Sequence, residues 1–242
     1  MIMELYYKYQ PVTWWIGVIE ADPKDVARII QPRYIPDDVL RGIRQETGFI
    51  DDALASMEPL GPPDKFLLMK TCKGHTVLFV NGFFSGVVEL PTWNAGKHLD
   101  VSAYTVHNIP NTISPDHRSG AYGARTIEFR TRQTPFNKEP EFGVHLVNDA
   151  GKWHFDRFGA KRPFEDEKAY RSYRKTDRFT VEMLVKYCRE LGIPVYDRDF
   201  YSNSWVLIER ILKPGQEGIT YEEAAVKFRI EQDNPQGRCA SV

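Results

Sequence analysis

The side chains that could hold a metal ion lie closest together on a predicted hairpin in the second half of the chain. His145 precedes the turn, and His154 and Asp156 follow it. Residues two apart in a strand project from the same face, so these three side chains could share one side of a sheet. A metal site needs three or four converging ligands, and the sequence has no HxH, HExxH or CxxC motif to supply them. We therefore expect solvated or hydrogen-bonded histidines here and no metal site.

Two carboxylates, Asp197 and Asp199, occur close together in the segment Tyr-Asp-Arg-Asp-Phe-Tyr. In an extended chain both would project from one face, where paired carboxylates can bind a divalent cation or share acid–base catalysis. Arg198 lies between them and Ser202-Asn203-Ser204 follows, which is typical of a polar loop between two strands. We expect such a loop, and we include both aspartates among the candidate partner-binding residues.

Basic residues recur at intervals of three and four in residues 165–178, a segment that we predict to be helical. On a helix this spacing places the side chains on one face and forms a cationic ridge. The ridge could bind phosphate or an acidic partner, although a solvated helix face has the same pattern. Its residues are Lys168, Arg171, Arg174, Lys175 and Arg178. All of them except Lys168 are candidate partner-binding residues.

No catalytic constellation can be assembled from the sequence. The nucleophile motif GxSxG and the phosphate-binding motifs GxGxxG and GxxxxGK[ST] are absent. Cys188 falls on the apolar face of a predicted helix, where a buried, unreactive thiol is expected. Asp166-Glu167-Lys168 has the carboxylate–lysine order of a metal-dependent nuclease motif, but it opens a predicted helix, where acidic residues complement the helix dipole. We predict no catalytic residues and no cofactor.

The composition is that of a globular protein with a large aromatic core. The 242 residues include 12 Tyr, 14 Phe and 5 Trp, and the net charge of −1 gives no general attraction to nucleic acid or anionic membrane. The longest apolar runs, 14–19 and 76–80, are far too short to cross a bilayer. Three widely spaced cysteines favour free thiols in a reducing compartment, and no secretory signal is recognisable. We expect a cytoplasmic protein that binds neither membranes nor nucleic acid.

Runs of aromatic and β-branched residues predict strands along most of the chain. Two joins are predicted to be hairpins, one at Lys73-Gly74 and one at Asn148-Asp149-Ala150-Gly151, because glycine suits a tight turn. The predicted strands are 4–9, 13–20, 65–72, 76–84, 100–108, 124–132, 142–147, 152–158, 193–196 and 205–212.

Helices are predicted where caps and a 3.6-residue period agree. Asp22 and Pro23 begin one helix, Thr180 caps another over 181–191, and Thr220 with Glu223 forms a capping box. The remaining predictions are helical segments over 36–57 and 165–178, polar loops over 90–99 and 109–123, and a frayed tail over 232–242. Together the elements predict a single α+β domain, residues 1–242, with a mainly antiparallel sheet of two hairpins and further strands packed by several helices.

Five short blocks spread over residues 14–208 resemble segments of other proteins. They are Trp14-Trp15-Ile16-Gly17-Val18-Ile19, His75-Thr76-Val77-Leu78-Phe79, Gly151-Lys152-Trp153-His154-Phe155, Pro163-Phe164-Glu165-Asp166 and Asp199-Phe200-Tyr201. With their order along the chain, they are similar to poorly characterised bacterial proteins found among candidate toxin-immunity factors. The resemblance implies an intracellular α+β protein that protects its producer from a toxin, and it supplies no binding residues.

Two functional hypotheses follow. The first is a non-enzymatic protein-binding module, an immunity protein that neutralises a cognate bacterial toxin by occluding its active site. The cationic ridge and the Asp197/Asp199 loop would provide charge complementarity to that partner. The alternative is an enzyme that acts on a phosphorylated or nucleotide substrate through Arg171, Arg174 and Arg178. A toxin gene immediately beside this one would favour the first hypothesis.

Overall fold

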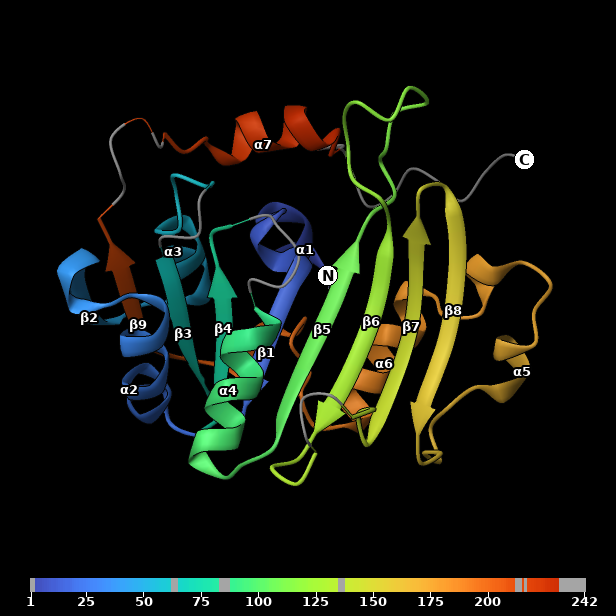
Figure 1. Cartoon of the computed structure of the whole chain (residues 1–242), viewed down its shortest axis with the longest axis horizontal. Helices are drawn as coiled ribbons and strands as arrows, with labels where there is room; N and C mark the ends of the chain where they lie inside the picture. The colour runs from blue at the N-terminus through green and yellow to red at the C-terminus, as the bar shows by residue number, and fades with distance from the viewer. Residues whose placement is uncertain are drawn as a thin grey trace.

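The described residues contain nine strands, which form one antiparallel sheet in the order β2-β9-β3-β4-β1-β5-β6-β7-β8 (Figure 1). The computed structural model describes residues 3–61, 65–82, 88–134, 138–211, 215 and 217–230. The strands are β1 Trp15–Ile19, β2 Leu40–Thr47, β3 Lys65–Thr71, β4 Thr76–Val80, β5 Ala103–Ile109, β6 Ala124–Arg130, β7 Phe142–Asp149, β8 Lys152–Gly159 and β9 Tyr201–Arg210. The predicted α+β class, with a mainly antiparallel sheet packed by helices, is confirmed.

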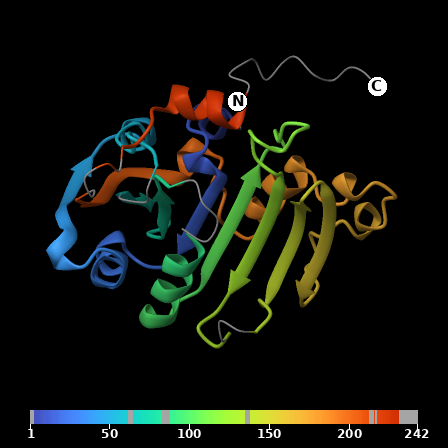
Figure 2. The ribbon, with the colours of Figure 1, turned by 45° about the horizontal axis from the view of Figure 1, so that its top comes forward.

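Helices cover the two faces of the sheet unequally. The α-helices are α1 Glu4–Lys8, α2 Pro23–Tyr34, α3 Ile50–Ala55, α4 Glu89–Leu99, α5 Glu167–Tyr170, α6 Val181–Glu190 and α7 Tyr221–Phe228. The 3-10 helices are η1 Val12–Trp14, η2 Asp37–Val39, η3 Lys175–Asp177 and η4 Arg198–Phe200. On one face α2 and α4 pack against each other and over β9, β3, β1 and β5, while α1, α3 and α6 lie on the opposite face (Figures 1 and 2).

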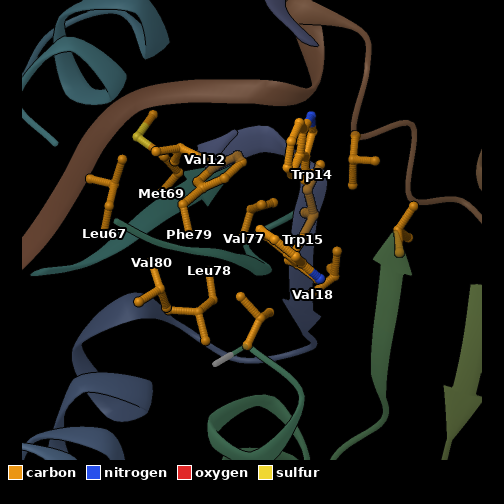
Figure 3. Packing of buried hydrophobic residues seen from close by; sticks show 14 of the residues in the cluster. Val12, Trp14, Trp15, Val18, Leu67, Met69, Val77, Leu78, Phe79 and Val80 are labelled. Atoms are coloured by element: carbon orange, nitrogen blue, oxygen red, sulfur yellow. The ribbon is translucent and has the colours of Figure 1, made fainter. Parts of the chain in front are cut away.

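The core is deepest where helices cover both faces. In β4 the side chains of Val77 and Phe79 enter the layer that contains Met69 and Trp14, whereas Leu78 and Val80 point to the opposite side (Figure 3). All five residues of β4 are buried, as are all five of β1. A strand covered on both faces must be apolar throughout, which explains the continuous apolar runs in the sequence.

Strands β6, β7 and β8 are covered on one face only. In β7 the side chains of Val144 and Leu146 are buried against the layer of α6, whereas His145 is half-buried and Val147 is exposed. Figure 2 shows these strands beside α4 with the helices behind them. Among the described residues α4 reaches the β5 and β6 edge of the side that carries His145, where Trp93 lies against Arg130, and no helix packs extensively over β7 and β8 on that side. We call this side of β6–β8, together with His107 of β5, the open sheet face.

Most predicted caps and turns are confirmed. The Asp22 carboxylate accepts a hydrogen bond from Lys24 N, and the Thr180 hydroxyl accepts one from Met183 N. Thr220 and Glu223 form the expected capping box. The second hairpin turns at Ala150 and Gly151, which have φ of 47° and 91°. Leu184 of α6 is fully buried, so the predicted core-facing side of that helix is also confirmed.

Three predicted elements in the first half of the chain are wrong. Residues 4–9 form α1, because one helical turn buries Leu5 and Tyr6 together. Residues 40–47, predicted as helix, form β2, the edge strand of the sheet, which pairs with β9. Residues 90–99, predicted as a loop, form α4. Pro91 lies in the first turn, where no N–H is required, and Gly96 allows close contact with Ala103.

Two predicted elements in the second half are also wrong. Residues 193–196 form turns, and the last strand begins at Tyr201 instead of residue 205. The continuous helix over 165–178 is replaced by α5, a turn and η3. Parts of the predicted strands 76–84 and 205–212, and the whole predicted tail 232–242, lie outside the described residues.

Candidate functional site

The sheet register aligns polar side chains in one row across four strands. His107 of β5 lies opposite Thr126 of β6, which lies opposite His145 of β7, which in turn lies opposite Asp156 of β8. Directly opposed residues of antiparallel strands project from the same face. The row therefore crosses the open sheet face, and the prediction that His145, His154 and Asp156 could share a face is confirmed by the register.

Glu128 connects the two histidines from the next row. It lies two residues from Thr126 on β6, diagonal to both rings. Its Oε1 is 2.9 Å from His145 Nε2, and its Oε2 is 3.3 Å from Arg130 Nε. The contact with His145 lacks the orientation of a full hydrogen bond. Glu128 is thus held between an imidazole and a guanidinium.

Helix α4 adds a second carboxylate. Glu89, in its first turn, places Oε1 3.2 Å from His107 Nε2, again without the orientation of a full hydrogen bond. The helix can approach this closely because Gly17 of β1 has no side chain: a Cβ there would lie 2.0 Å from Thr92 Oγ1. A glycine in a central strand therefore positions a functional group on the neighbouring helix.

Burial and charge act against each other on these groups. Burial alone would raise the pKa of Glu128, but His145 and Arg130 together bring that pKa below its ordinary value. For His107, burial lowers the pKa, and the opposing attraction of Glu89 and Glu128 does not restore it. At neutral pH the site therefore holds an ionised Glu128 and a neutral His107.

Aromatic side chains contact His145 and Arg130, the two partners of Glu128. The ring of His145 meets Phe158 of β8 edge-on, with centroids 5.0 Å apart. The guanidinium of Arg130 lies over Trp93 of α4, 5.4 Å from the ring centroid. Both contacts limit side-chain motion. The face therefore presents carboxylate, imidazole and guanidinium groups in fixed positions, which suits recognition of complementary charges.

Among the described residues no three His, Cys, Asp or Glu side chains are grouped to hold a metal ion. Cys72 is exposed and Cys188 is buried, and both are unpaired. Burial raises the pKa of the Cys188 thiol, as expected for an unreactive cysteine. No helix within the described ranges combines the length and the apolar character needed to cross a membrane.

The basic residues predicted to form a ridge do not share a helix face. Helix α5 ends after Tyr170, whose hydroxyl contacts that of Tyr187 at 2.9 Å. Beyond it, Arg178 Nε donates to Ser172 O at 2.8 Å, and its guanidinium lies over Phe155. These contacts with the layer behind the sheet replace helix propagation, which is weak for so short a segment.

Within this segment the individual basic residues differ in exposure. Arg171 and Arg174 are exposed, whereas Lys175 and Arg178 are half-buried. The role of these four residues in partner binding stays a prediction, but the cationic ridge on which it was based is not formed.

Asp197 and Asp199, expected in a polar loop and included among the candidate partner-binding residues, make different contacts. Asp197 forms a two-point ion pair with Arg189 of α6, with N···O distances of 3.0 and 2.8 Å. Asp199 lies in η4 and is exposed. Residues 198–200 form the 3-10 helix η4, so the chain is not extended across the two carboxylates. Asp166 caps α5 by accepting from Ala169 N, so the acidic block there opens a helix as predicted.

Sequence reasoning missed Glu89, His107, Glu128 and Arg130. The alternation in Arg-Thr-Ile-Glu-Phe-Arg, residues 125–130, did contain a signal, because Thr126, Glu128 and Arg130 occupy every second position. What the alternation does not give is which strand lies beside β6, and hence which side chains meet Glu128.

Comparisons of the chain with models of known protein families, with curated proteins and with solved structures found no match in any of the three. The resemblance to candidate toxin-immunity factors therefore stays a prediction.

Proposed function

We propose that this protein is a binding module that engages a partner protein through its open sheet face, and that it neutralises a bacterial toxin in this way. One observation carries the proposal: three strands at the end of a large sheet leave one face without a covering layer among the described residues. An antiparallel sheet can leave one face in contact with water, and such a face is accessible to a partner protein.

The size of the face suits a protein partner. Three strands about 4.8 Å apart and seven or eight residues long give roughly 15 by 25 Å. This area can form the centre of an interface, which needs about 800 Å² from each partner. The outer side of α4 and the β7–β8 turn extend it, and Leu90 and Val147 contribute exposed apolar surface.

The charges on the face favour a basic partner. By the sheet register Asp149, Asp156 and Lys152 project to the same side as Glu128 and Arg130. With Glu89 from α4, this surface contains four carboxylates and two permanently charged cations, Arg130 and Lys152. A toxin that acts on nucleic acid needs a basic surface to bind phosphates, and an acidic face can occlude such a surface. Ion pairs already formed within the array reduce the ordering cost of binding.

The alternative hypothesis, an enzyme with an arginine-rich helix face, loses its support. That hypothesis required a continuous helix over 165–178, and the segment is divided between α5 and η3. No other observation favours turnover of a phosphorylated or nucleotide substrate.

The test is co-expression with the product of the neighbouring gene, followed by pull-down and a growth assay. Replacing Asp149 and Asp156 with Arg should abolish capture and protection while the protein stays folded. The matched control reverses two exposed carboxylates elsewhere, Glu190 and Glu217, and should bind normally. Loss of binding by Arg171→Glu with Arg174→Glu, but not by the Asp149/Asp156 variant, would move the interface to the α5–η3 segment and contradict the proposal.

A further inference from the structure

A pocket of about 270 Å³ lies between α4, the beginning of β5 and the end of β6. One part of its lining is apolar and comes from Leu90, Trp93, Val101 and Ala103. The other part is polar and includes the cationic side chains of Arg130 and Lys97, and no Asp or Glu lines the pocket. The pocket thus combines an apolar wall with positive charge.

The guanidinium of Arg130 is held in place through two of its three nitrogens. Its Nε faces Glu128 at 3.3 Å, and its Nη1 donates to Lys138 O at 2.8 Å. Its plane rests over Trp93. Within the described part of the chain Nη2 makes no hydrogen bond. Arg130 therefore offers a fixed donor, and Lys97, exposed in the last turn of α4, offers a second, mobile one.

The other polar groups in the lining are already used. The hydroxyls of Thr131 and Thr134 both donate to the Glu141 carboxylate. The side-chain amide of Asn94 donates to Tyr34 Oη at 2.5 Å. An incoming ligand thus meets two cationic donors and few others, which fits one group with two acceptor oxygens. A phosphate dianion has more oxygens than these donors can satisfy.

We propose that this pocket binds a small organic acid, with its carboxylate between Arg130 and Lys97 and its apolar body against Trp93 and Leu90. The volume is just below the range of about 300–1,000 Å³ for typical ligand pockets, so a nucleotide would not fit inside it. Burial against Trp93 contributes affinity, and the two cations select the charge. The pocket shares Arg130 and Leu90 with the surface proposed for partner binding, but its occupation by a small acid requires no partner, so the two proposals are tested separately.

The test is calorimetric titration of the full chain with phenylacetate and isovalerate as probes. Saturable one-to-one binding is expected for at least one of them. Phenylacetamide, which has the same shape without the charge, and inorganic phosphate should each bind at least tenfold more weakly. The absence of saturable binding up to millimolar probe, or equal binding of phenylacetate and phenylacetamide, would overturn the proposal. Tighter binding of phosphate would do so as well.

Variants locate the site. Arg130→Gln should abolish binding, but Arg130 is half-buried and its loss could disturb folding. Two exposed positions avoid this difficulty: Lys97→Gln should weaken binding severalfold, and Leu90→Trp should block the pocket. Lys186→Gln, an exposed lysine of α6, is the matched control and should bind as the wild type does. Unchanged affinity in both Lys97→Gln and Leu90→Trp would show that the acid binds elsewhere.

Discussion

His107 is largely buried beside two carboxylates. Its pKa depends on the balance between burial and the attraction of these carboxylates. Glu89 from α4 and Glu128 from β6 favour the charged ring, whereas burial and the nearby His145 oppose it. Burial prevails, so the pKa of His107 lies below the ordinary 6.5. The folded protein therefore holds this ring neutral at a pH at which the unfolded chain binds a proton.

This imbalance predicts an acid-sensitive fold. As the pH falls below about 6.5, the unfolded chain takes up protons that the folded state refuses, so the free energy of unfolding decreases. Each unit by which the pKa is lowered corresponds to about 1.4 kcal/mol. This decrease should begin at a higher pH than the loss of the stability contributed by Glu128. The Glu128 contribution is fully present above about pH 4.5 and is lost as the pH falls through the lowered pKa of Glu128.

Urea denaturation at a series of pH values measures this effect. His107→Gln should reduce the loss of stability between about pH 6.5 and 4.5. Some of the loss should remain, because burial also lowers the pKa of His75. His98→Gln, at an exposed position of α4, is the control and should keep the wild-type profile. Identical profiles for the wild type and His107→Gln would show that His107 is not held neutral.

At this scale the sequence predicted only contacts that depend on local spacing. His145, His154 and Asp156 belong to one hairpin, so the two-residue period and the turn were sufficient to place them on one face. The contact of Glu128 with His145 requires the β6–β7 register, and that of Glu89 with His107 requires the seating of a helix on a sheet. Neither is encoded in the spacing of residues along the chain.

Helix α4 lies against the sheet because of one missing side chain. A methyl group at Gly17 would meet Thr92 Oγ1 at 2.0 Å and Val88 at 3.0 Å. Val88 is the N-cap residue of α4 and Thr92 lies at the start of the helix, so the helix would have to move away from β1. We predict that Gly17→Ala lowers the free energy of unfolding by about 1–3 kcal/mol, the usual cost of overpacking.

The chain contains a matched control for this substitution. Gly42 also lies in a strand, and a Cβ there would have nothing within 4 Å. Gly42→Ala should therefore leave the denaturation midpoint unchanged or raise it slightly. If the two variants were equally stable, α4 would not be seated on Gly17 as described.

The elements that the sequence did not predict share one cause: tertiary contacts decided them. Residues 40–47 carry no strong strand pattern, yet they form β2 because β9 offers an edge to pair with. Conversely, the 3.6-residue spacing over 165–178 is genuine, but Tyr170 and Arg178 are bound to other parts of the structure. Capped elements such as α2, α6 and α7 were predicted because their signals are local.

Across the whole molecule, the sheet has one half covered on both faces and one half covered on a single face. β1, β3 and β4 lie between α2 and α4 on one side and α1 and α3 on the other. β7 and β8 have α6 and the α5–η3 segment behind them, and no described helix lies in front of them. The strand order that creates this division, with β9 between β2 and β3, joins residues from opposite ends of the sequence. No periodicity along the chain could indicate it.

This division predicts a gradient of local stability. Hydrogen-bonded amides of β1 and β4 should exchange with solvent most slowly, because exposing them requires the loss of both helical layers. The corresponding amides of β7 and β8 should exchange faster, since one layer and a sheet edge protect them. Hydrogen–deuterium exchange with mass spectrometry distinguishes these peptides. Equal protection in both halves would mean that the open sheet face is covered in solution. If a partner binds there, protection should rise in β6–β8 and stay unchanged in β2, at the opposite edge of the sheet.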